Sequence, residues 1–165
     1  IRDPEMSRGL GDVYKRQVLM AAEAYNETGT DRQKAWDLLN SVRTRAEATS
    51  ITEANYDEMM SARKKTHNLT FIDDSTPEGK FRTALYWERG FELAFEGQRK
   101  YDLIRWGVLG KALKLFGEIS SVNQKENKPY PAYRNFTEGK HELFPIPLKE
   151  IQSNPKLNGM NNNGY

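Results

Sequence analysis

The clearest pattern in this chain is a helical repeat of apolar side chains near its middle, between residues 77 and 96. The side chains in this stretch recur at intervals of three and four, which places them on one face of an α-helix. The pattern predicts a buried helix whose core includes Phe91 and Phe95. We expect Gly97 to break it and a shorter helix to follow and end at Gly107. The positions that share the predicted face are Phe81, Ala84, Leu85, Glu88, Phe91, Glu92 and Phe95.

Two more helical stretches lie close together near the beginning of the chain, at 18–27 and 30–47. Gly29 stands between them and is well placed to end the first helix. Thr30 and Gln33 have the spacing of a capping box at the start of the second helix. Helices joined by so short a turn pack antiparallel, so residues 18–48 are expected to form a hairpin of the tetratricopeptide kind.

The remaining segments complete an all-α prediction. A short helix is expected through Met60, and the broken helix region is expected to span 77–119. After it the sequence changes to an irregular, Pro- and Asn-rich closing segment at 120–165. Each proline in the stretch 144–147 disfavours a helical conformation in the residue before it, so this stretch is expected to be extended.

Residues 1–17 differ from the rest, because they show neither a hydrophobic period nor the apolar central block of a signal peptide. Residues 12–17 correspond to the translation of GAT GTG TAT AAG AGA CAG, which resembles a transposase adaptor used in sequencing libraries. We therefore expect 1–17 to be a non-native or disordered leader, and the domain to occupy 18–165. An ordinary polar N-terminal segment is the alternative interpretation.

Composition excludes several classes of site. The chain has no cysteine and two histidines, which excludes disulfides and thiolate metal sites and leaves too few ligands for a histidine-rich metal centre. A net charge of +2 gives no reason to expect a nucleic-acid partner. Neither a Gly-rich phosphate loop nor a Gly-x-Ser-x-Gly motif occurs. We therefore expect no catalytic residue, metal or cofactor.

Three glutamates on the predicted central helix form the one notable carboxylate group, since Glu88, Glu92 and Glu96 are spaced four residues apart. A glycosidase needs two carboxylates on opposite sides of the sugar bond, and a single stripe does not supply that arrangement. Our interpretation is a set of structural ion pairs, because guanidinium groups bind carboxylates through two hydrogen bonds. The expected partners are Arg89, Arg99 and Arg105.

Three sequence blocks, in this order, resemble the SusD/RagB family. The first contains Ala22-Glu23-Ala24-Tyr25-Asn26 and continues into the second helix of the hairpin. The second joins a Glu-Leu-x-Phe-Glu-Gly helix end to an Asp-Leu-x-Arg-Trp stretch, and the third is the proline-containing closing segment. The positions that match the family motif, and to which the resemblance assigns a structural role, are Glu88, Arg89, Glu92, Phe95, Glu96, Gly97, Arg99, Asp102, Arg105, Trp106, Pro145, Pro147, Asn154 and Pro155.

The resemblance implies a function as well as an all-helical scaffold. It implies a non-catalytic protein that captures a glycan or another nutrient at the outer-membrane surface of Bacteroidetes-like bacteria. Its partner would be a SusC-like TonB-dependent transporter, over which it sits as a lid. The family's signal peptide and lipid-bearing cysteine lie upstream of the blocks found here. Membrane attachment is therefore expected only through an N-terminal lipid anchor that this chain does not contain.

The loop between 127 and 136 holds the candidate sugar contacts. A sugar site needs an aromatic face for the C–H side of the ring and polar groups for its hydroxyls, and Tyr130, Tyr133 and Asn135 offer both. The alternative is that this loop packs onto the helices and binds nothing.

Two other functions stay open at this stage. One is a helical-repeat scaffold that binds a protein in its concave groove, which rests on the hairpin alone. The other is a glycoside-active enzyme that uses the glutamate stripe and a second acid across a cleft.

Overall fold

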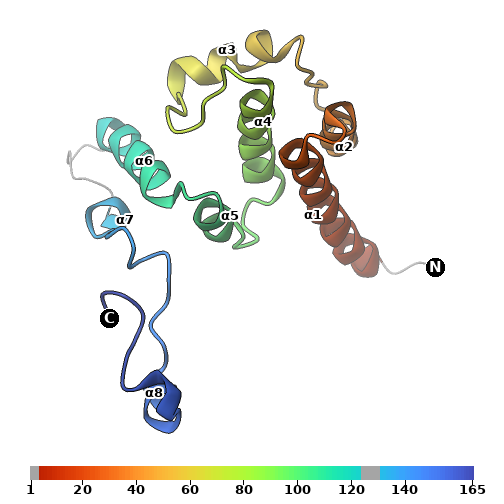
Figure 1. Cartoon of the computed structure of the whole chain (residues 1–165). Coiled ribbons are helices and arrows are strands. Elements are labelled where there is room, and N and C mark those ends of the chain that lie inside the picture. The colour runs from red at the N-terminus through yellow and green to blue at the C-terminus, as the bar shows by residue number, and fades with distance from the viewer. Residues whose placement is uncertain (1–3, 124–130) are drawn as a thin grey trace. The chain divides into compact units, whose positions relative to one another are not determined.

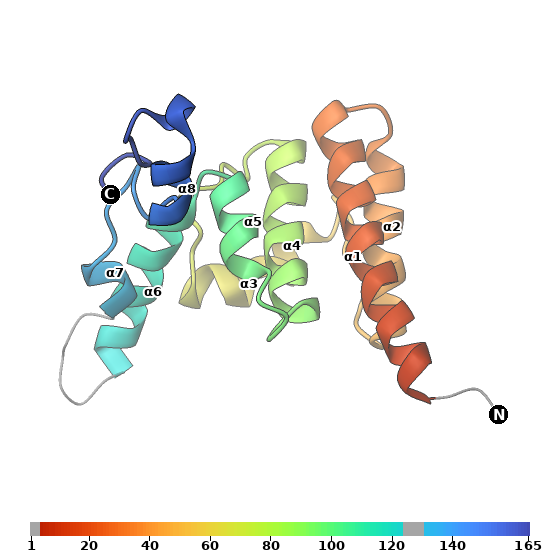
Figure 2. The same cartoon turned by 90° about the horizontal axis from the view of Figure 1, so that it is seen from below.

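The computed structural model describes the backbone of residues 4–123 and 131–165 and the side chains of 14–118 and 131–165. Every regular element within these residues is helical, which confirms the all-α prediction (Figures 1 and 2). The chain divides into two compact units, Ile1–Arg99 and Lys100–Tyr165. The α-helices are α1 Pro4–Thr28, α2 Arg32–Arg45, α3 Tyr56–Thr66, α4 Pro77–Glu92, α5 Arg99–Arg105, α6 Leu109–Asn123, α7 Pro131–Arg134 and α8 Leu148–Ser153, and η1, Pro155–Leu157, is a 3-10 helix.

Helices α1 and α2 form the predicted hairpin and lie side by side in both views (Figures 1 and 2). Gly29 has a φ of +64°, a left-handed conformation that glycine adopts without steric cost. The cap of α2 is Asp31 and not Thr30, since the Asp31 carboxylate accepts a hydrogen bond from the Lys34 backbone N–H at 2.9 Å.

The core of the first unit forms where this hairpin meets α3 and α4. Trp36 packs edge-on against Phe81, with their ring centroids 4.9 Å apart. Helix α3 lies later in the chain than the short helix expected through Met60, and it buries Tyr56 and Met60 on this core. Other apolar side chains with at most 2% exposure here are Leu19, Ala22, Ala35, Leu39, Val42, Ile51, Ala84 and Leu85.

The structure differs from the expected disordered leader, because residues 4–17 continue α1 as a helix. Lys15 is only 8% exposed, and its Nζ lies 2.8 Å from both the backbone oxygen of Glu92 and a carboxylate oxygen of Glu96. A formed helix adds one hydrogen bond for each residue that joins it, so a polar segment joined to a stable helix readily extends it. The adaptor origin of the segment stays a prediction.

Helix α4 begins as its sequence indicates but ends earlier than predicted. The Thr76 side chain accepts a hydrogen bond from the Gly79 N–H at 3.1 Å, and Pro77 occupies the first turn, where it costs no hydrogen bond. The helix ends at Glu92. The prediction that Phe91 and Phe95 are core residues was therefore wrong: Phe91 is 55% exposed and Phe95 is fully exposed. Phe95 lies in the turn after the helix, where its φ is +64° and the helical period no longer sets its direction.

The second unit contains α6, the short helices on either side of it and an irregular closing segment. The stretch 144–147 is neither helix nor strand, and Pro147 has φ −54° and ψ 136°. Side-chain amides hold it instead: Asn161 accepts from the Ile146 N–H at 2.7 Å, and Asn162 donates to the Phe144 carbonyl at 2.7 Å. Two asparagines thereby supply hydrogen bonds that a neighbouring strand would otherwise give.

Candidate ligand site

The second unit contains a cavity of about 460 Å³, which lies within the usual size range of small-molecule sites. Residues of α5, of α6 and of the segment after α6 form its wall. The lining residues are Ile104, Gly107, Leu109, Gly110, Lys111, Lys114, Tyr133, Phe136, Glu138 and Glu142.

Two aromatic rings that line this cavity, Tyr133 and Phe136, pack on glycines of α6, of which Gly110 also lines the cavity. A Cβ atom on Gly117 would lie 2.8 Å from Cδ1 of Tyr133, and one on Gly110 would lie 2.7 Å from Cε1 of Phe136. These distances are shorter than real Cβ contacts, so both rings lie closer to α6 than any larger side chain would permit. The two rings are therefore held in place by the α6 backbone.

The other feature of the cavity is its polar lining. Lys111 and Lys114 come from α6, whereas Glu138 and Glu142 follow α7. Within the part of the chain that the structure describes, none of these four side chains takes part in an ion pair or hydrogen bond. One carboxylate oxygen of Glu142, Oε2, is buried without a hydrogen-bond donor. The lining of the cavity thus combines hydrogen-bond donors, hydrogen-bond acceptors and two aromatic rings that pack on α6.

Of the three sugar-contact residues predicted from the sequence, one lines this cavity. Tyr133 lines it and is half-buried, whereas Asn135 is exposed and is not among the lining residues. Tyr130 lies outside the described residues. The packing of Tyr133 on Gly117 also matches the alternative interpretation, in which this loop covers a helix.

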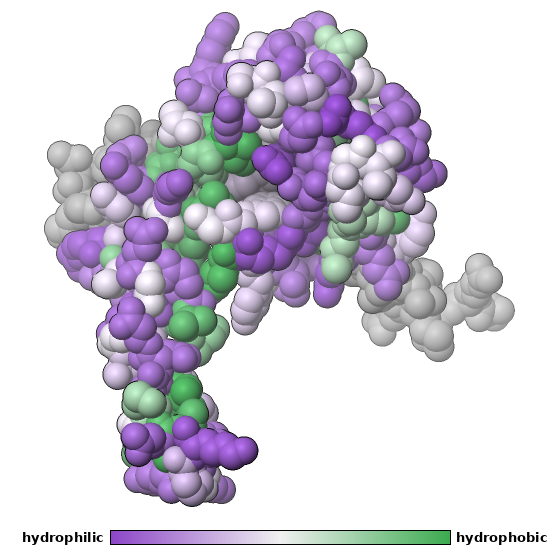
Figure 3. Space-filling view, viewed as in Figure 1, coloured by the Kyte–Doolittle hydropathy of each residue, from purple (hydrophilic) through white to green (hydrophobic). Residues whose placement is uncertain are grey.

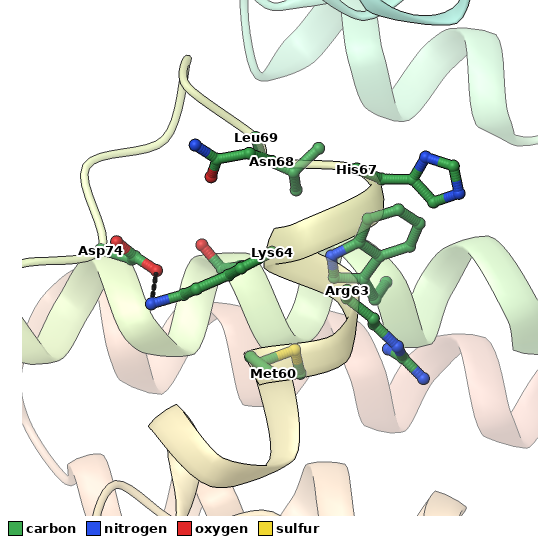
Figure 4. A pocket seen from close by; sticks show the side chains of 9 residues that line it. Met60, Arg63, Lys64, His67, Asn68, Leu69 and Asp74 are labelled. Atoms are coloured by element: carbon green, nitrogen blue, oxygen red, sulfur yellow. Dashed lines mark ion pairs between the residues drawn. The ribbon is translucent and has the colours of Figure 1, made fainter. Parts of the chain in front are cut away.

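A much smaller pocket in the first unit lies between α3 and α4 (Figure 4). Its volume of about 10 Å³ is the space of a single water molecule, so it is too small for a nutrient. The Arg63 guanidinium lies over the rings of Phe91, at 4.7 Å, and Trp87, at 5.6 Å. Lys64 forms an ion pair with Asp74 at 2.8 Å, which Figure 4 also shows. We interpret this pocket as part of the scaffold.

The glutamate stripe forms ion pairs with cations from the two N-terminal helices. Glu88 pairs with Arg43 of α2, Glu92 with Arg45 of α2, and Glu96 with Lys15 of α1. The expected partners were nearby arginines in sequence, whereas these cations lie more than 40 residues away. The three carboxylates line neither of the two cavities. Their role here is to join α4 and the turn after it to the hairpin.

Comparison with known proteins identifies the family. The model of the SusD family matches residues 10–165. The chain belongs to the SusD family. SusD-like protein P25 of Formosa agariphila is 37% identical over 158 residues, which are 94% of this chain and 24% of that protein. SusD-like protein P2 of the same organism is 32% identical over 152 residues, which are 92% of this chain and 25% of that protein.

This SusD-family chain therefore spans about a quarter of the length of these two relatives. No solved structure showed significant similarity to it. Members of the family are generally binding proteins without catalytic activity. In the described residues, no helix has the length and apolar character needed to cross a membrane. The same residues contain no group of three histidine or acidic side chains placed to hold a metal ion.

Several motif positions of this SusD-family chain lie at the junctions between its helices, whereas Glu88 and Arg89 lie within α4. The Arg99 guanidinium donates to the Tyr86 carbonyl at 2.9 Å and lies 3.8 Å from the centre of the Tyr86 ring. Asp102 is buried and accepts from the Nη2 of Arg105 at 3.1 Å, and Arg105 also covers the ring of Trp106 at 4.8 Å. Gly97 supplies the left-handed turn between α4 and α5. Arg89 is 4% exposed. These contacts are structural.

Two further motif positions cap the short C-terminal helices. Pro147 is the N-cap of α8, and Asn154, just before Pro155, accepts a hydrogen bond from the Lys156 N–H at 3.1 Å as the N-cap of η1. Asn154 is also the C-cap of α8, so it ends that helix and starts the next one. The closing segment is therefore ordered by caps, and its apolar side chains contribute little burial.

Proposed function

We propose that this chain belongs to a protein that captures an extracellular glycan without altering it. Membership of the SusD family supports a nutrient-binding role of the SusD type. The finer steps are part of the proposal: attachment to the outer membrane through a lipid anchor, and delivery of the ligand to a SusC-like TonB-dependent transporter. The mostly hydrophilic face in Figure 3 and the mean hydropathy of −0.83 fit a domain that works in water.

The observation that carries the proposal is the aromatic wall of the cavity in the second unit. The C–H side of a sugar ring is apolar and packs on flat aromatic side chains such as Tyr133 and Phe136. Sugar hydroxyls need polar partners around that platform, and the lysines and glutamates of the same cavity provide them. Since the rings rest directly on α6, little conformational freedom remains to be lost when a ligand binds.

Calorimetry of the 165-residue chain with a panel of oligosaccharides tests this function, with analysis of the products after each titration. We expect binding without release of new reducing ends. Tyr133→Ala removes half of the aromatic wall and should weaken binding at least roughly tenfold. Tyr101→Ala is the matched control, because Tyr101 is exposed in the same unit and does not line the cavity.

Two outcomes would contradict the proposal. If Tyr133→Ala bound every oligosaccharide as the unmodified chain does, the cavity would not be the site. If reducing ends were released and the release disappeared in Glu88→Gln or Glu92→Gln, the glutamate stripe would be catalytic and the capture role would be wrong.

A further inference from the structure

We infer that the cavity of the second unit selects an uncharged sugar residue over an acidic or an amino sugar. This inference rests on the glycan-capture function proposed above and adds the class of ligand. It follows from the charges that line the cavity, from the absence of pairing among them and from one buried carboxylate oxygen.

The charges of the lining cancel. Lys111 and Lys114 contribute two positive charges, and Glu138 and Glu142 contribute two negative charges. A ligand carboxylate that approaches the lysines also approaches the glutamates, so the net Coulomb attraction is small. Lys111, Lys114 and Glu138 are exposed and Glu142 is half-buried, so an ionic ligand group loses only part of its hydration in the cavity. Without a net counter-charge, that cost is not offset. The same argument, with signs reversed, applies to an ammonium group.

The four charged side chains are nevertheless available to a ligand. Among the residues that the structure describes, no ion pair joins these lysines to these glutamates. Ammonium groups only donate hydrogen bonds and carboxylates only accept them, whereas a sugar hydroxyl does both. A ring of hydroxyls therefore satisfies both sides of the cavity at once.

Glu142 gives the most specific indication. Its Oε2 atom is buried and receives no hydrogen bond from the described residues, and a buried acceptor without a donor costs free energy. A hydroxyl of a sugar stacked on Tyr133 or Phe136 is an uncharged donor of the required kind. The geometry thus assigns Glu142 as an acceptor for a ligand hydroxyl.

Calorimetry with oligosaccharides of equal length tests the inference. The uncharged probes are oligomers of glucose, galactose and mannose, and the charged probes are oligogalacturonate and oligoglucosamine. At least one uncharged probe should bind the 165-residue chain roughly tenfold more tightly than both charged probes. Its affinity should change less than about twofold between low salt and about 0.5 M salt, because salt screens only interactions between charges.

The possible results separate this inference from the function on which it rests. If a charged oligosaccharide binds most tightly and its binding falls steeply with salt, the preference for uncharged sugars is wrong while glycan capture stands. If no oligosaccharide binds, both the preference for uncharged sugars and the glycan-capture function are wrong.

Charge variants provide a second measurement. Glu142→Gln leaves the lining with one excess positive charge and should improve oligogalacturonate relative to the uncharged probe several-fold. Lys114→Gln leaves one excess negative charge and should improve oligoglucosamine in the same way. The controls Lys149→Gln and Glu150→Gln change the chain's net charge equally at exposed positions of α8 that do not line the cavity. Equal shifts in the cavity variants and the controls would overturn the inference.

Discussion

Replacing Glu88 by glutamine tests how the first unit is held together. The Arg43–Glu88 pair joins α2 to α4 across 45 residues of sequence, and the two side chains are only 8% and 7% exposed. Arg43 also donates through Nε and Nη2 to the Thr49 carbonyl, at 2.8 and 2.7 Å. The Arg43 guanidinium thus keeps two hydrogen bonds when the carboxylate is lost, which limits the loss in the free energy of unfolding.

The local charges set the size of the expected effect. Arg63 lies near this pair: burial lowers its pKa most, the positive charge of Arg43 lowers it further, and Glu88 raises it. Without Glu88, the buried guanidinium of Arg43 loses its counter-charge, and the positive charge of the half-buried Arg63 nearby is no longer offset. Breaking a buried pair costs about 3–5 kcal/mol, whereas glutamine keeps an acceptor of the same shape. We expect a loss of about 2–3 kcal/mol in the free energy of unfolding for Glu88→Gln, and about 3–5 kcal/mol for Glu88→Ala.

Glu92→Gln is the matched comparison, because Glu92 lies one turn later on the same helix. The Glu92 carboxylate is 12% exposed, but its partner Arg45 is 48% exposed, and its second partner, Lys15 at 3.7 Å, also pairs with Glu96 at 2.8 Å. Solvent screening of Arg45 and the remaining partner of Lys15 should keep the loss to about 1 kcal/mol, below that of Glu88→Gln. Urea unfolding followed by circular dichroism measures all three variants. Equal losses for Glu88→Gln and Glu92→Gln would refute the argument that burial determines the cost.

Three further predictions concern stability. Gly79→Ala should cost several kcal/mol or prevent folding, because the new Cβ would lie 1.6 Å from a backbone carbonyl oxygen, and urea unfolding measures it. The hydrogen bond from Arg82 lowers the pKa of Glu27, so the stability from this exposed pair is present above the ordinary value of 4.5 and is lost as pH falls below it. Urea midpoints of Glu27→Gln and the unmodified chain should therefore converge in acid. Phe81→Ala should cost about 3–5 kcal/mol and Phe95→Ala less than about 0.5 kcal/mol, in the same assay.

Local sequence signals predicted the hairpin from residue 18 onward and the start of α4, and they failed at residues 4–17 and at the end of α4. The apolar spacing continues through Phe95, and no glycine or proline occurs between Gly90 and Gly97 to mark an earlier end. The chain nevertheless leaves the helix after Glu92, and it is Leu93, at 3% exposure, that enters the core. Tertiary packing buries Leu93 and leaves Phe95 exposed, although Phe95 continues the helical spacing. A periodic pattern in the sequence does not indicate where packing ends a helix.

The ion pairs show a related limit. The sequence showed that Glu88 needs a cation, and the nearest arginines along the chain were natural candidates. The actual partner, Arg43, lies 45 positions earlier and comes close only because the hairpin packs against α4. Charge and spacing indicate that a buried carboxylate is paired, but the identity of a long-range partner depends on the packing of whole helices.

Two glycines of α6 were the informative sequence signal for the cavity, and a search for polar and aromatic residues overlooks glycines. Gly110 and Gly117 are seven residues apart, two turns of a helix, so they share one face of α6. Two such glycines leave a strip without side chains, and Tyr133 and Phe136 occupy it. The sequence of the aromatic loop was ambiguous between sugar binding and packing, and the glycine strip shows that the loop packs on α6. The proposed sugar contacts depend on rings that pack on α6, so Gly117→Ala should displace Tyr133 and weaken oligosaccharide binding in calorimetry while leaving every polar group of the cavity in place.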